Sequence, residues 1–505
     1  MDSSEKAKGK EKVETTEASE TIIAVGGEDN SRAAGGLSPG DIGAYASRMD
    51  EATDVWAKKM LDKIDVVLQR APSYTASKSI STAPASTEDR DKKLYEPRAV
   101  AIGPHHRKED NYFRITDEHK LWCVKKVIGD SYKQDLGKFL GKMKEREEDA
   151  VKFYRERYGK DYNFRMDSRS FLEMLMLDSC FILFALSFHY GHAKVLPNLS
   201  GFTSVPWARR DIVRALDLVK SDLLLLSNQI PFFILEDVFK MKNDIDPTKK
   251  MQNGGNEGNG SIREDALNFF DNLGLGRNSS KGTEKKEVDH LLDLYHMYLE
   301  PPDHSSNNLE DIGLLIDPHR YVPSATELRR KSAVNFKKKK IVTQSVLDVT
   351  TCKFGHIQMP ALRVEDHTNI LLHNLVSFEE SPGTTDSYIT AYVAFMDCIV
   401  QREEDVELLE NRGVLEHRLT SPAEVVALFG QFHNVIDHQK TPGYLAKVYK
   451  EVIRCRHSKW RRMYADAKQR YCSSVWLSIS FVAGITLSVA ALIQTIYTIT
   501  GSYKK

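Results

Sequence analysis

The chain has 505 residues, and 71 Lys and Arg side chains balance 71 Asp and Glu side chains to a net charge of zero. This balance argues against a nucleic-acid partner, because affinity for a phosphate backbone depends on excess cationic charge. Six scattered cysteines without a CxxC pair argue against a disulfide framework and favour reduced, buried thiols.

The beginning of the chain is poor in large apolar residues, which predicts disorder. Trp56 and Met60 then share the face of an amphipathic helix that Pro72 ends, and a Ser-, Thr- and Ala-rich linker follows. Together with the later segments, these patterns predict disorder over residues 1–45, an amphipathic helix over 46–72, a linker over 73–93, a helical globular domain over 94–472, a membrane-spanning helix over 473–500 and a tail over 501–505.

The stretch Leu216–Met241 is apolar nearly all round, so we expect other parts of the protein to enclose it. Polar residues, among them Asp222, Asn228 and Gln229, interrupt it too often for a membrane span. Pro231 removes a backbone donor beside this polar group. The pattern therefore predicts a kinked or broken central helix with a buried polar cluster at the bend.

A second nearly all-apolar helix is predicted over Ser168–Tyr190. We hypothesise that it packs beside the first and that its Asp178 is the partner of Asn228 and Gln229. A role in specifying the fold is favoured over catalysis, because polar groups at helix bends mostly satisfy backbone groups.

The rest of the globular domain shows helical periodicity without a repeat. Helices are expected within residues 120–158, 262–273, 288–299, 368–379, 388–400, 405–409, 421–433 and 442–471. Ser345–Val364 alternates and is rich in β-branched residues, which predicts a small β-hairpin. The basic run Lys337–Lys340 is interpreted as an exposed hairpin edge, with anionic-lipid binding or nuclear targeting as the alternative. The predicted fold class is mainly α: one large helical domain with a small β-hairpin, plus one C-terminal transmembrane helix.

Motifs of known catalytic or metal chemistry are absent from the sequence: there is no GxSxG, Walker A, kinase or Rossmann pattern. The adjacent His105 and His106 point to different sides of any regular backbone and lack a companion motif, so no metal site is assigned. Cys180 lies on an apolar helix, where a thiol is usually inert. We therefore assign no catalytic, cofactor-binding or metal-binding residue and expect no cofactor.

Near the C-terminus, Val475–Thr500 carries no charge over 26 residues, where about 20 cross a bilayer core. The residues that mark the span are Val475, Trp476, Gly484, Gln494 and Tyr497. More Lys and Arg residues precede the span than follow it, so the positive-inside rule places the large domain in the cytosol. We expect a single-pass protein of the plasma membrane.

Small residues recur within the span, and they form a small-xxx-small ridge that favours helix–helix packing and a homo-oligomer: Ser480, Gly484 and Ser488. Glycosylation sequons begin at Asn198, Asn259 and Asn278. They would suit a domain outside the cell, but chance sequons are common and do not reverse the predicted orientation.

Five ordered blocks resemble the plant protein family catalogued as domain of unknown function 247. They are YEPRAVAIGPHH (95–106), FLEMLMLDSCFIL (171–183), DLLLLSNQIPFFIL (222–235), SVLDVTTCKFGHIQMPALRVEDHTNILLHNLVSFEE (345–380) and QTIY (494–497). The chain departs from the family pattern in three places. Ser227 stands where the family usually has Glu. His105, His106 and Arg107 stand where it usually has Tyr-His-His after Gly-Pro, so only His106 matches in register. Phe184 stands where it usually has an acidic residue. If these groups form a charged site in relatives, this chain lacks part of it.

The resemblance implies a terminal membrane anchor, a plant source and no established enzymatic activity. Some grass members of the family are implicated as pollen-side determinants of self-incompatibility. We therefore predict a membrane-anchored recognition or signalling protein with an unknown protein partner, contacted through the loops Lys242–Glu287 and Asp303–Arg320. The alternatives are a structural membrane scaffold, or a hydrolase or transferase whose site combines Asp178, Asn228 and His106.

Overall fold

The computed structural model describes residues 39–69, 94–107, 113–159, 166–190, 207–245, 261–276, 286–301, 322–339, 345–352, 355–382, 384, 387–434, 444–471 and 475–502. The chain divides into two units, Met1–Val55 and Trp56–Lys505. In the first unit, the described residues are the beginning of helix α1 (Pro39–Gln69). This helix begins at Pro39, earlier than the predicted residue 46. Most of the predicted disordered segment and the predicted linker lie outside the described residues. The second unit holds all the elements below.

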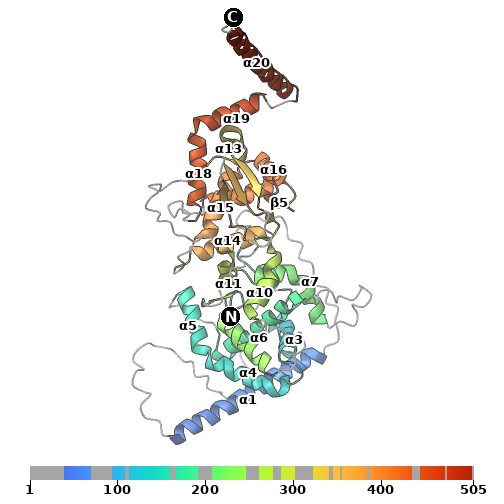
Figure 1. Cartoon of the computed structure of the whole chain (residues 1–505). Coiled ribbons are helices and arrows are strands. Elements are labelled where there is room, and N and C mark those ends of the chain that lie inside the picture. Colours follow the sequence, from blue (N-terminus) through green and yellow to red (C-terminus); the bar gives the residue numbers. More distant parts are fainter. Residues whose placement is uncertain are drawn as a thin grey trace, which may run out of the picture. The chain divides into compact units, whose positions relative to one another are not determined.

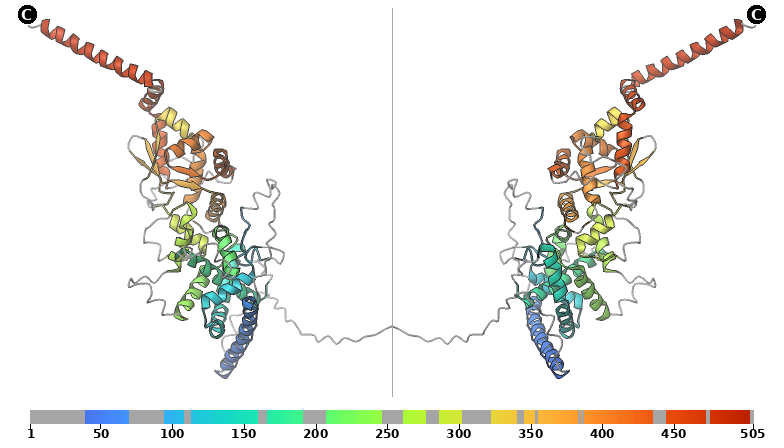
Figure 2. Two further views of the ribbon diagram at one scale, coloured as in Figure 1. Left: turned by 90° about the vertical axis from the view of Figure 1, so that its right-hand side faces the viewer. Right: turned by 90° about the vertical axis from the view of Figure 1, so that its left-hand side faces the viewer.

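A buried helix organises the first half of the second unit. Its helices are α3 (Asp117–Ile128), α4 (Tyr132–Glu145), α5 (Glu147–Tyr158), α6 (Ser168–Leu186), α7 (Trp207–Asp222) and α8 (Phe232–Ile245). Helix α6 packs against α3, α4 and α8 (Figures 1 and 2). Asp167 caps its N-terminus by accepting from the Ser170 N–H at 2.6 Å. The predicted proximity of the two apolar segments is confirmed, because α6 and α8 are in contact.

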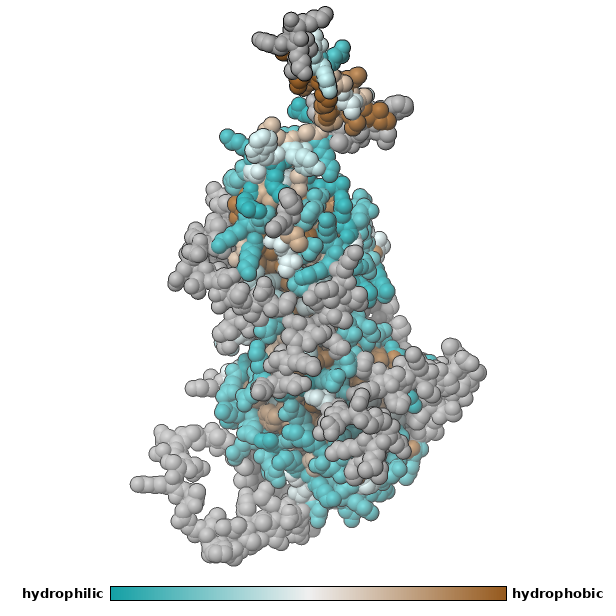
Figure 3. Space-filling view, viewed as in Figure 1, coloured by the Kyte–Doolittle hydropathy of each residue, from teal (hydrophilic) through white to brown (hydrophobic). Residues whose placement is uncertain are grey.

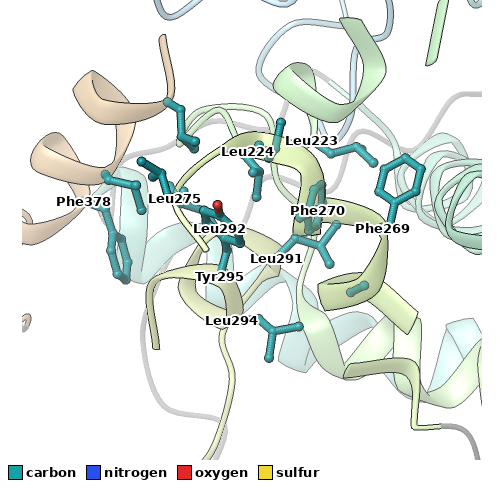
Figure 4. Close-up of a cluster of buried hydrophobic side chains, with 14 of the residues drawn as sticks. Leu223, Leu224, Phe269, Phe270, Leu275, Leu291, Leu292, Leu294, Tyr295 and Phe378 are labelled. Carbon is teal, nitrogen blue, oxygen red and sulfur yellow. The ribbon is translucent and has the colours of Figure 1, made fainter. Parts of the chain in front are cut away.

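The predicted break in the central apolar stretch is confirmed. Helix α7 ends at Asp222, an irregular turn follows, and α8 begins at Phe232 directly after Pro231. Proline suits this place because the first N–H groups of a helix have no intrahelical acceptor. Leu223, Leu224 and Leu225 of the turn are buried. Figure 4 shows Leu223 and Leu224 among side chains of the next two helices, α10 (Ile262–Phe270) and α11 (Leu291–Leu299). Apolar burial therefore fixes a segment that is not helical.

The second half of this unit is also mainly helical. Its helices are α13 (Ala325–Ser332), α14 (Thr368–Glu379), α15 (Tyr388–Ile399), α16 (Glu403–Asn411), α17 (Pro422–Gly430), α18 (Ala446–His457) and α19 (Lys459–Tyr471). Short 3-10 turns occupy Ser187–Tyr190, Asp271–Leu273 and Gln431–Asn434. Every residue of α15 is buried, so this helix holds the centre of the second half as α6 holds the first.

The β part of the fold is small, as predicted, but it is more than a hairpin. Strands β2 (Thr350–Cys352) and β3 (His356–Met359) form the predicted antiparallel pair. Strand β1 (Asn335–Lys338) joins β3 in parallel and forms an edge of the sheet. A separate parallel pair joins β4 (Leu362–Val364) to β5 (Leu415–His417). The basic run thus begins on an exposed sheet edge, where charged side chains discourage pairing with another chain.

The single helix predicted over residues 442–471 is wrong, because Ser458 divides it into α18 and α19. The Ser458 backbone is extended there, with φ −70° and ψ 113°. Its side-chain oxygen accepts from the Arg461 N–H at 3.4 Å, so this serine caps the start of α19. The polar periodicity continues across the break, which is why the sequence pattern did not reveal it.

The last helix, α20 (Val475–Ser502), contains the predicted span. Residues 479–499 are uncharged and mainly apolar, and none of them is buried. Figure 3 shows hydrophobic side chains on the surface of α20, whereas hydrophilic side chains cover most of the described surface elsewhere. This helix is therefore long and apolar enough to cross a membrane, and it is not a buried core helix in this structure.

Candidate functional site

The extended segment Arg98–Gly103 lies against a carboxylate at the end of α7. Asp222 accepts hydrogen bonds from three consecutive backbone N–H groups, those of Arg98 at 3.1 Å, Ala99 at 2.6 Å and Val100 at 3.0 Å. Burial raises the pKa of Asp222 to about 6, although these backbone donors act to lower it. In the sequence, Asp222 was recognised only as an interruption of an apolar run. Its role in holding the backbone of the extended segment was missed.

Asn228 continues this row of contacts from the turn between α7 and α8. Its side-chain oxygen accepts from the Ile102 N–H at 2.7 Å, and its amide nitrogen donates to the carbonyls of Val100 at 3.1 Å and Asp222 at 2.9 Å. The amide thus uses its acceptor and both donor hydrogens on backbone groups. Asn228 is buried, so these bonds replace the water it has lost.

Gln229 closes the turn itself. Its amide nitrogen donates to the carbonyls of Leu223 and Leu225, each at 2.8 Å. The backbone carbonyl oxygen of Gln229 accepts a hydrogen bond from the Tyr154 hydroxyl at 3.0 Å. Gln229 therefore supplies hydrogen-bond donors to a buried stretch that has left the helix and lost its regular partners.

Asp178 of α6 reaches the same extended segment from another side. It accepts from the Gly103 N–H at 2.8 Å and forms a buried ion pair with Lys120 at 2.5 Å. Lys120 also donates to the Ala101 carbonyl at 2.6 Å. Asp178 and Asn228 thus hold neighbouring N–H groups of one segment. The hypothesised direct pairing is not observed, because among the described contacts Asp178 bonds to Gly103 and Lys120, and Asn228 and Gln229 bond to backbone groups.

A pocket of about 500 Å³ opens beside this buried polar cluster. It is lined by Tyr95, Glu96, His105, His106, Arg157, Tyr158, Leu226, Ser227 and Ser381. The pocket therefore combines side chains from the residues on either side of the extended segment, from α5, from the turn after α7 and from the residues just after α14. Three of these four segments lie in, or directly after, the blocks 95–106, 222–235 and 345–380 of the sequence analysis; α5 is the exception.

The centre of the pocket wall is a Ser–His contact. His106 Nε2 lies 2.8 Å from Ser227 Oγ, and the Ser227 hydroxyl also donates to the Tyr95 carbonyl at 3.2 Å. The Tyr158 hydroxyl donates to the Ser227 carbonyl at 3.3 Å, and its ring stacks on His105 with centroids 5.5 Å apart. The wall thus offers imidazole and phenol rings for stacking and polar atoms for hydrogen bonding.

Arg157 gives the pocket a half-buried cation. Burial lowers the pKa of this guanidinium, and the charges of Asp289 and Asp293 act in the opposite direction. Its Nη1 is buried and has no hydrogen-bond partner among the described residues. The sequence did not indicate Arg157, because an arginine in a charged amphipathic helix resembles any solvated one.

A second buried amide ties the turn to the other half of the unit. Asn374 of α14 accepts from the Leu226 N–H at 2.9 Å and donates to the carbonyls of Leu94 at 2.9 Å and Ile370 at 2.8 Å. These bonds join α14 to the turn and to Leu94, which lies before the extended segment. The pocket is therefore bounded by parts whose backbone is held by buried hydrogen bonds.

Several other reactive groups in the described residues are occupied or enclosed. Burial raises the pKa of the Cys180 thiol, which disfavours the nucleophilic thiolate. Glu379 accepts from His296 at 2.8 Å and from the first N–H groups of α15, those of Ile389 and Thr390. Within the described part of the chain, no group of His, Cys, Asp and Glu residues is suited to hold a metal ion.

Comparison with known proteins gives the family. A family model described as a plant protein of unknown function, DUF247, matches residues 80–490. The chain belongs to this family. A UPF0481 protein of Arabidopsis thaliana is 25% identical over 423 residues, which cover 80% of this chain and 82% of the relative. A putative UPF0481 protein of the same plant is 26% identical over 177 residues, 34% of this chain and 32% of the relative. No solved structure matches the chain.

In this DUF247 protein, four of the five blocks that carry the family resemblance meet around one segment; the fifth lies in α20. The first block supplies Tyr95 and His106, the second Asp178, the third Ser227 and Asn228, and the fourth Asn374. His105 and Ser227, two of the departures from the family pattern, both line the pocket. The third, Phe184, packs edge-on against Trp122 with centroids 5.1 Å apart and lies outside the pocket lining.

Proposed function

We propose that this protein is a membrane-anchored recognition protein, whose α20 crosses the bilayer and whose globular domain binds a protein partner without catalysing a reaction. The observation that carries the proposal is that every residue of the long apolar segment 479–499 is exposed. Apolar surface costs about 25 cal/mol per Å² in water, and a bilayer removes this cost. The 21-residue segment rises about 30 Å as a helix, which matches a hydrocarbon core.

The anchor is tested by alkaline carbonate extraction of plant membranes that contain the full-length protein. We expect the protein to stay in the membrane pellet. A matched variant with Ile485→Lys and Leu492→Lys in the exposed span should be released, because charges at mid-bilayer are costly. Release of the unaltered protein would overturn the proposal.

We further propose that the globular domain faces the cytosol at the plasma membrane. The basic residues of α18 and α19 before the span support this orientation through the positive-inside rule. The sequons at Asn198, Asn259 and Asn278 lie outside the described residues. A glycosidase that shifts the mobility of the native protein would reverse the orientation, whereas unchanged mobility is the expected result.

The pocket around Ser227 is the proposed recognition site, together with the loops of residues 242–287 and 303–320, which are largely outside the described residues. Its support is the set of stacking and hydrogen-bonding groups on a backbone held by buried polar contacts. Ser381→Trp should fill the pocket and reduce partner capture by proximity labelling in plant membranes. Asn411→Trp, at an exposed position of α16, is the control.

A pollen-side role in self-incompatibility is the finer form of this proposal, and it is supported by the family membership alone. Exchanging residues 242–287 and 303–320 between two relatives of different specificity should then exchange their partner choice. Unchanged partner choice would count against recognition through these loops. A structural membrane scaffold would lack partner specificity altogether.

The alternative is a hydrolase, and the contact that favours it is the 2.8 Å approach of His106 to Ser227. A site made of Asp178, Asn228 and His106 is not supported, because Asp178 and Asn228 are buried and bonded to backbone groups. The second Ser227 bond, to the Tyr95 carbonyl, competes for the proton that a histidine base would take. A fluorophosphonate probe that labels the protein but not Ser227→Ala would establish the hydrolase, whereas we expect no labelling.

We also propose that α20 self-associates through the ridge of Ser480, Gly484 and Ser488. A side chain added at Gly484 meets no other described atom within 4 Å, so this face is open to a second helix. Gly484→Leu should reduce cross-linked dimer in membranes. Unchanged cross-linking would remove this contact.

A further inference from the structure

Helix α19 has one face on the globular domain and one face without a partner. Ala465 is 5% exposed, and α19 packs against α13. Arg461 lies against Gly355 in the turn between β2 and β3, where an added Cβ would meet its guanidinium group. These two positions fix which side of α19 faces the protein.

The other side of α19 carries large apolar side chains. Trp460 is 81% exposed, Met463 62% and Tyr464 61%. Their spacing of three and four residues places them on one stripe of a helix with about 3.6 residues per turn. Among the described residues outside α20, the other exposed large apolar side chains are Val55, Val66 and Tyr95. The stripe is therefore a concentration of apolar surface that the folded chain leaves uncovered.

Basic residues border this stripe. On the helix, Lys468 falls on one flank, and Lys459 and Arg470 fall on the other; all three are exposed. The neighbouring α13 adds an exposed basic group at its C-terminal end, Arg329, Arg330 and Lys331. The acidic residues of these two helices are Asp466, and Glu327, which pairs with Lys331. The surface around the stripe is consequently cationic.

We infer that α19 lies in the headgroup region of the membrane that α20 crosses, with Trp460, Met463 and Tyr464 in the lipid interface and its Lys and Arg side chains on anionic lipid headgroups. This inference rests on the proposed membrane anchor. Residues 472–474 alone separate the two helices, and three residues span at most about 11 Å. The end of α19 therefore lies within about 11 Å of the start of α20, and so beside the bilayer once α20 is inserted.

The chemistry of the stripe matches a lipid interface better than a protein surface. Trp and Tyr rings prefer the boundary between hydrocarbon and headgroups, where an apolar ring and a polar atom are both accommodated. Lys and Arg stems extend along apolar surface and deliver the charge to phosphate groups. Anionic leaflets attract basic segments beside a span, and the amphipathic pattern of α19 is that of a helix lying in the interface.

The test uses the full-length protein with Cys352→Ser and Cys472→Ser, because Cys352 is exposed and Cys472 adjoins α19. An environment-sensitive fluorophore is attached through Trp460→Cys, or through Arg462→Cys on the side of α19 away from the stripe. A third label, through Ile485→Cys, reports the span. Each protein is reconstituted in phosphatidylcholine vesicles with and without phosphatidylserine, and nitroxide lipids quench the fluorophore.

Headgroup nitroxides should quench the label at position 460 strongly when phosphatidylserine is present, and should leave the label at 462 unquenched. The quenching at 460 should be lost in phosphatidylcholine alone and in a variant with Lys459→Glu, Lys468→Glu and Arg470→Glu. No quenching at 460 in anionic vesicles, or equal quenching at 460 and 462, overturns the orientation. If the label at 460 is quenched equally with and without phosphatidylserine and in the charge-reversed variant, the proposed contacts of Lys and Arg with anionic headgroups are overturned.

The label at 485 separates this inference from the anchor on which it rests. Acyl-chain nitroxides should quench it in every vesicle. If 485 is quenched and 460 is not, the anchor stands and the placement of α19 is wrong. If 485 is not quenched, the proposed membrane anchor itself is overturned.

Discussion

Replacing Asn228 by Ala is the sharpest test of the buried polar cluster. The substitution removes an acceptor that holds the Ile102 N–H at 2.7 Å and a donor to the Val100 carbonyl at 3.1 Å. It also removes a donor to the Asp222 carbonyl, but that oxygen keeps the Leu225 N–H at 3.3 Å. Two buried backbone groups therefore lose the hydrogen-bond partner that the described structure gives them.

The size of the effect follows from this count. An unsatisfied buried backbone group costs about 1–3 kcal/mol, so Asn228→Ala should reduce the free energy of unfolding by about 2–6 kcal/mol. Domains are commonly stable by about 5–15 kcal/mol, so the variant should lose a large share of its stability. Opening should begin in the extended segment, because that is where the unpaired groups lie.

The measurement is urea denaturation of the full-length protein in non-ionic detergent, followed by far-UV circular dichroism. Hydrogen exchange at the Ile102 amide reports the local effect. Asn411→Ala is the control, because Asn411 is exposed at the end of α16 and its loss should change stability by at most about 0.5 kcal/mol. A loss below about 1 kcal/mol in Asn228→Ala, with Ile102 still protected, would refute the role assigned to this amide.

Three further substitutions, one of them with a matched control, are tested by the same denaturation. The folded state binds the proton of Asp222 more tightly than the unfolded state, since burial raises its pKa from 3.8 to about 6. The stability of the wild type relative to Asp222→Asn should therefore rise by up to about 3 kcal/mol as the pH falls from about 7 to below 3.8, and a flat difference would contradict this. Gly103→Ala should cost more than about 2 kcal/mol, because φ is +70° and the added Cβ would lie 2.5 Å from the Gln229 carbonyl oxygen. Gly413→Ala, with φ +67° and only the flexible Lys338 side chain within 4 Å, should cost about 1–2 kcal/mol, and equal losses would mean that close approach is unimportant. Glu379→Gln should cost about 2–3 kcal/mol, because the amide places donors against the His296 and α15 donors; an unchanged midpoint would contradict the assigned contacts.

Much of the fold followed from apolar periodicity. Helix α6 was predicted to be enclosed because its own residues are apolar on nearly every side of the helix. The break before α8 was predicted from Pro231 and the polar residues next to it. The parallel pairing of β1 with β3 was missed, since a partner strand from another part of the chain leaves no local signal. The division at Ser458 was missed for the opposite reason, because helical periodicity continues through it.

The sequence by itself determined that Asp178, Asn228 and Gln229 are unusual residues, because a polar group inside an apolar segment is costly unless it is bonded. It also determined that the last segment is long and apolar enough to span a membrane. Only the tertiary structure decided what the polar groups hold: their partners are mostly backbone atoms, which every residue carries and which no sequence pattern distinguishes. The same limit applies to the contact of His106 with Ser227, whose residues are 121 positions apart, and to α19, where packing against α13 decides which face remains exposed.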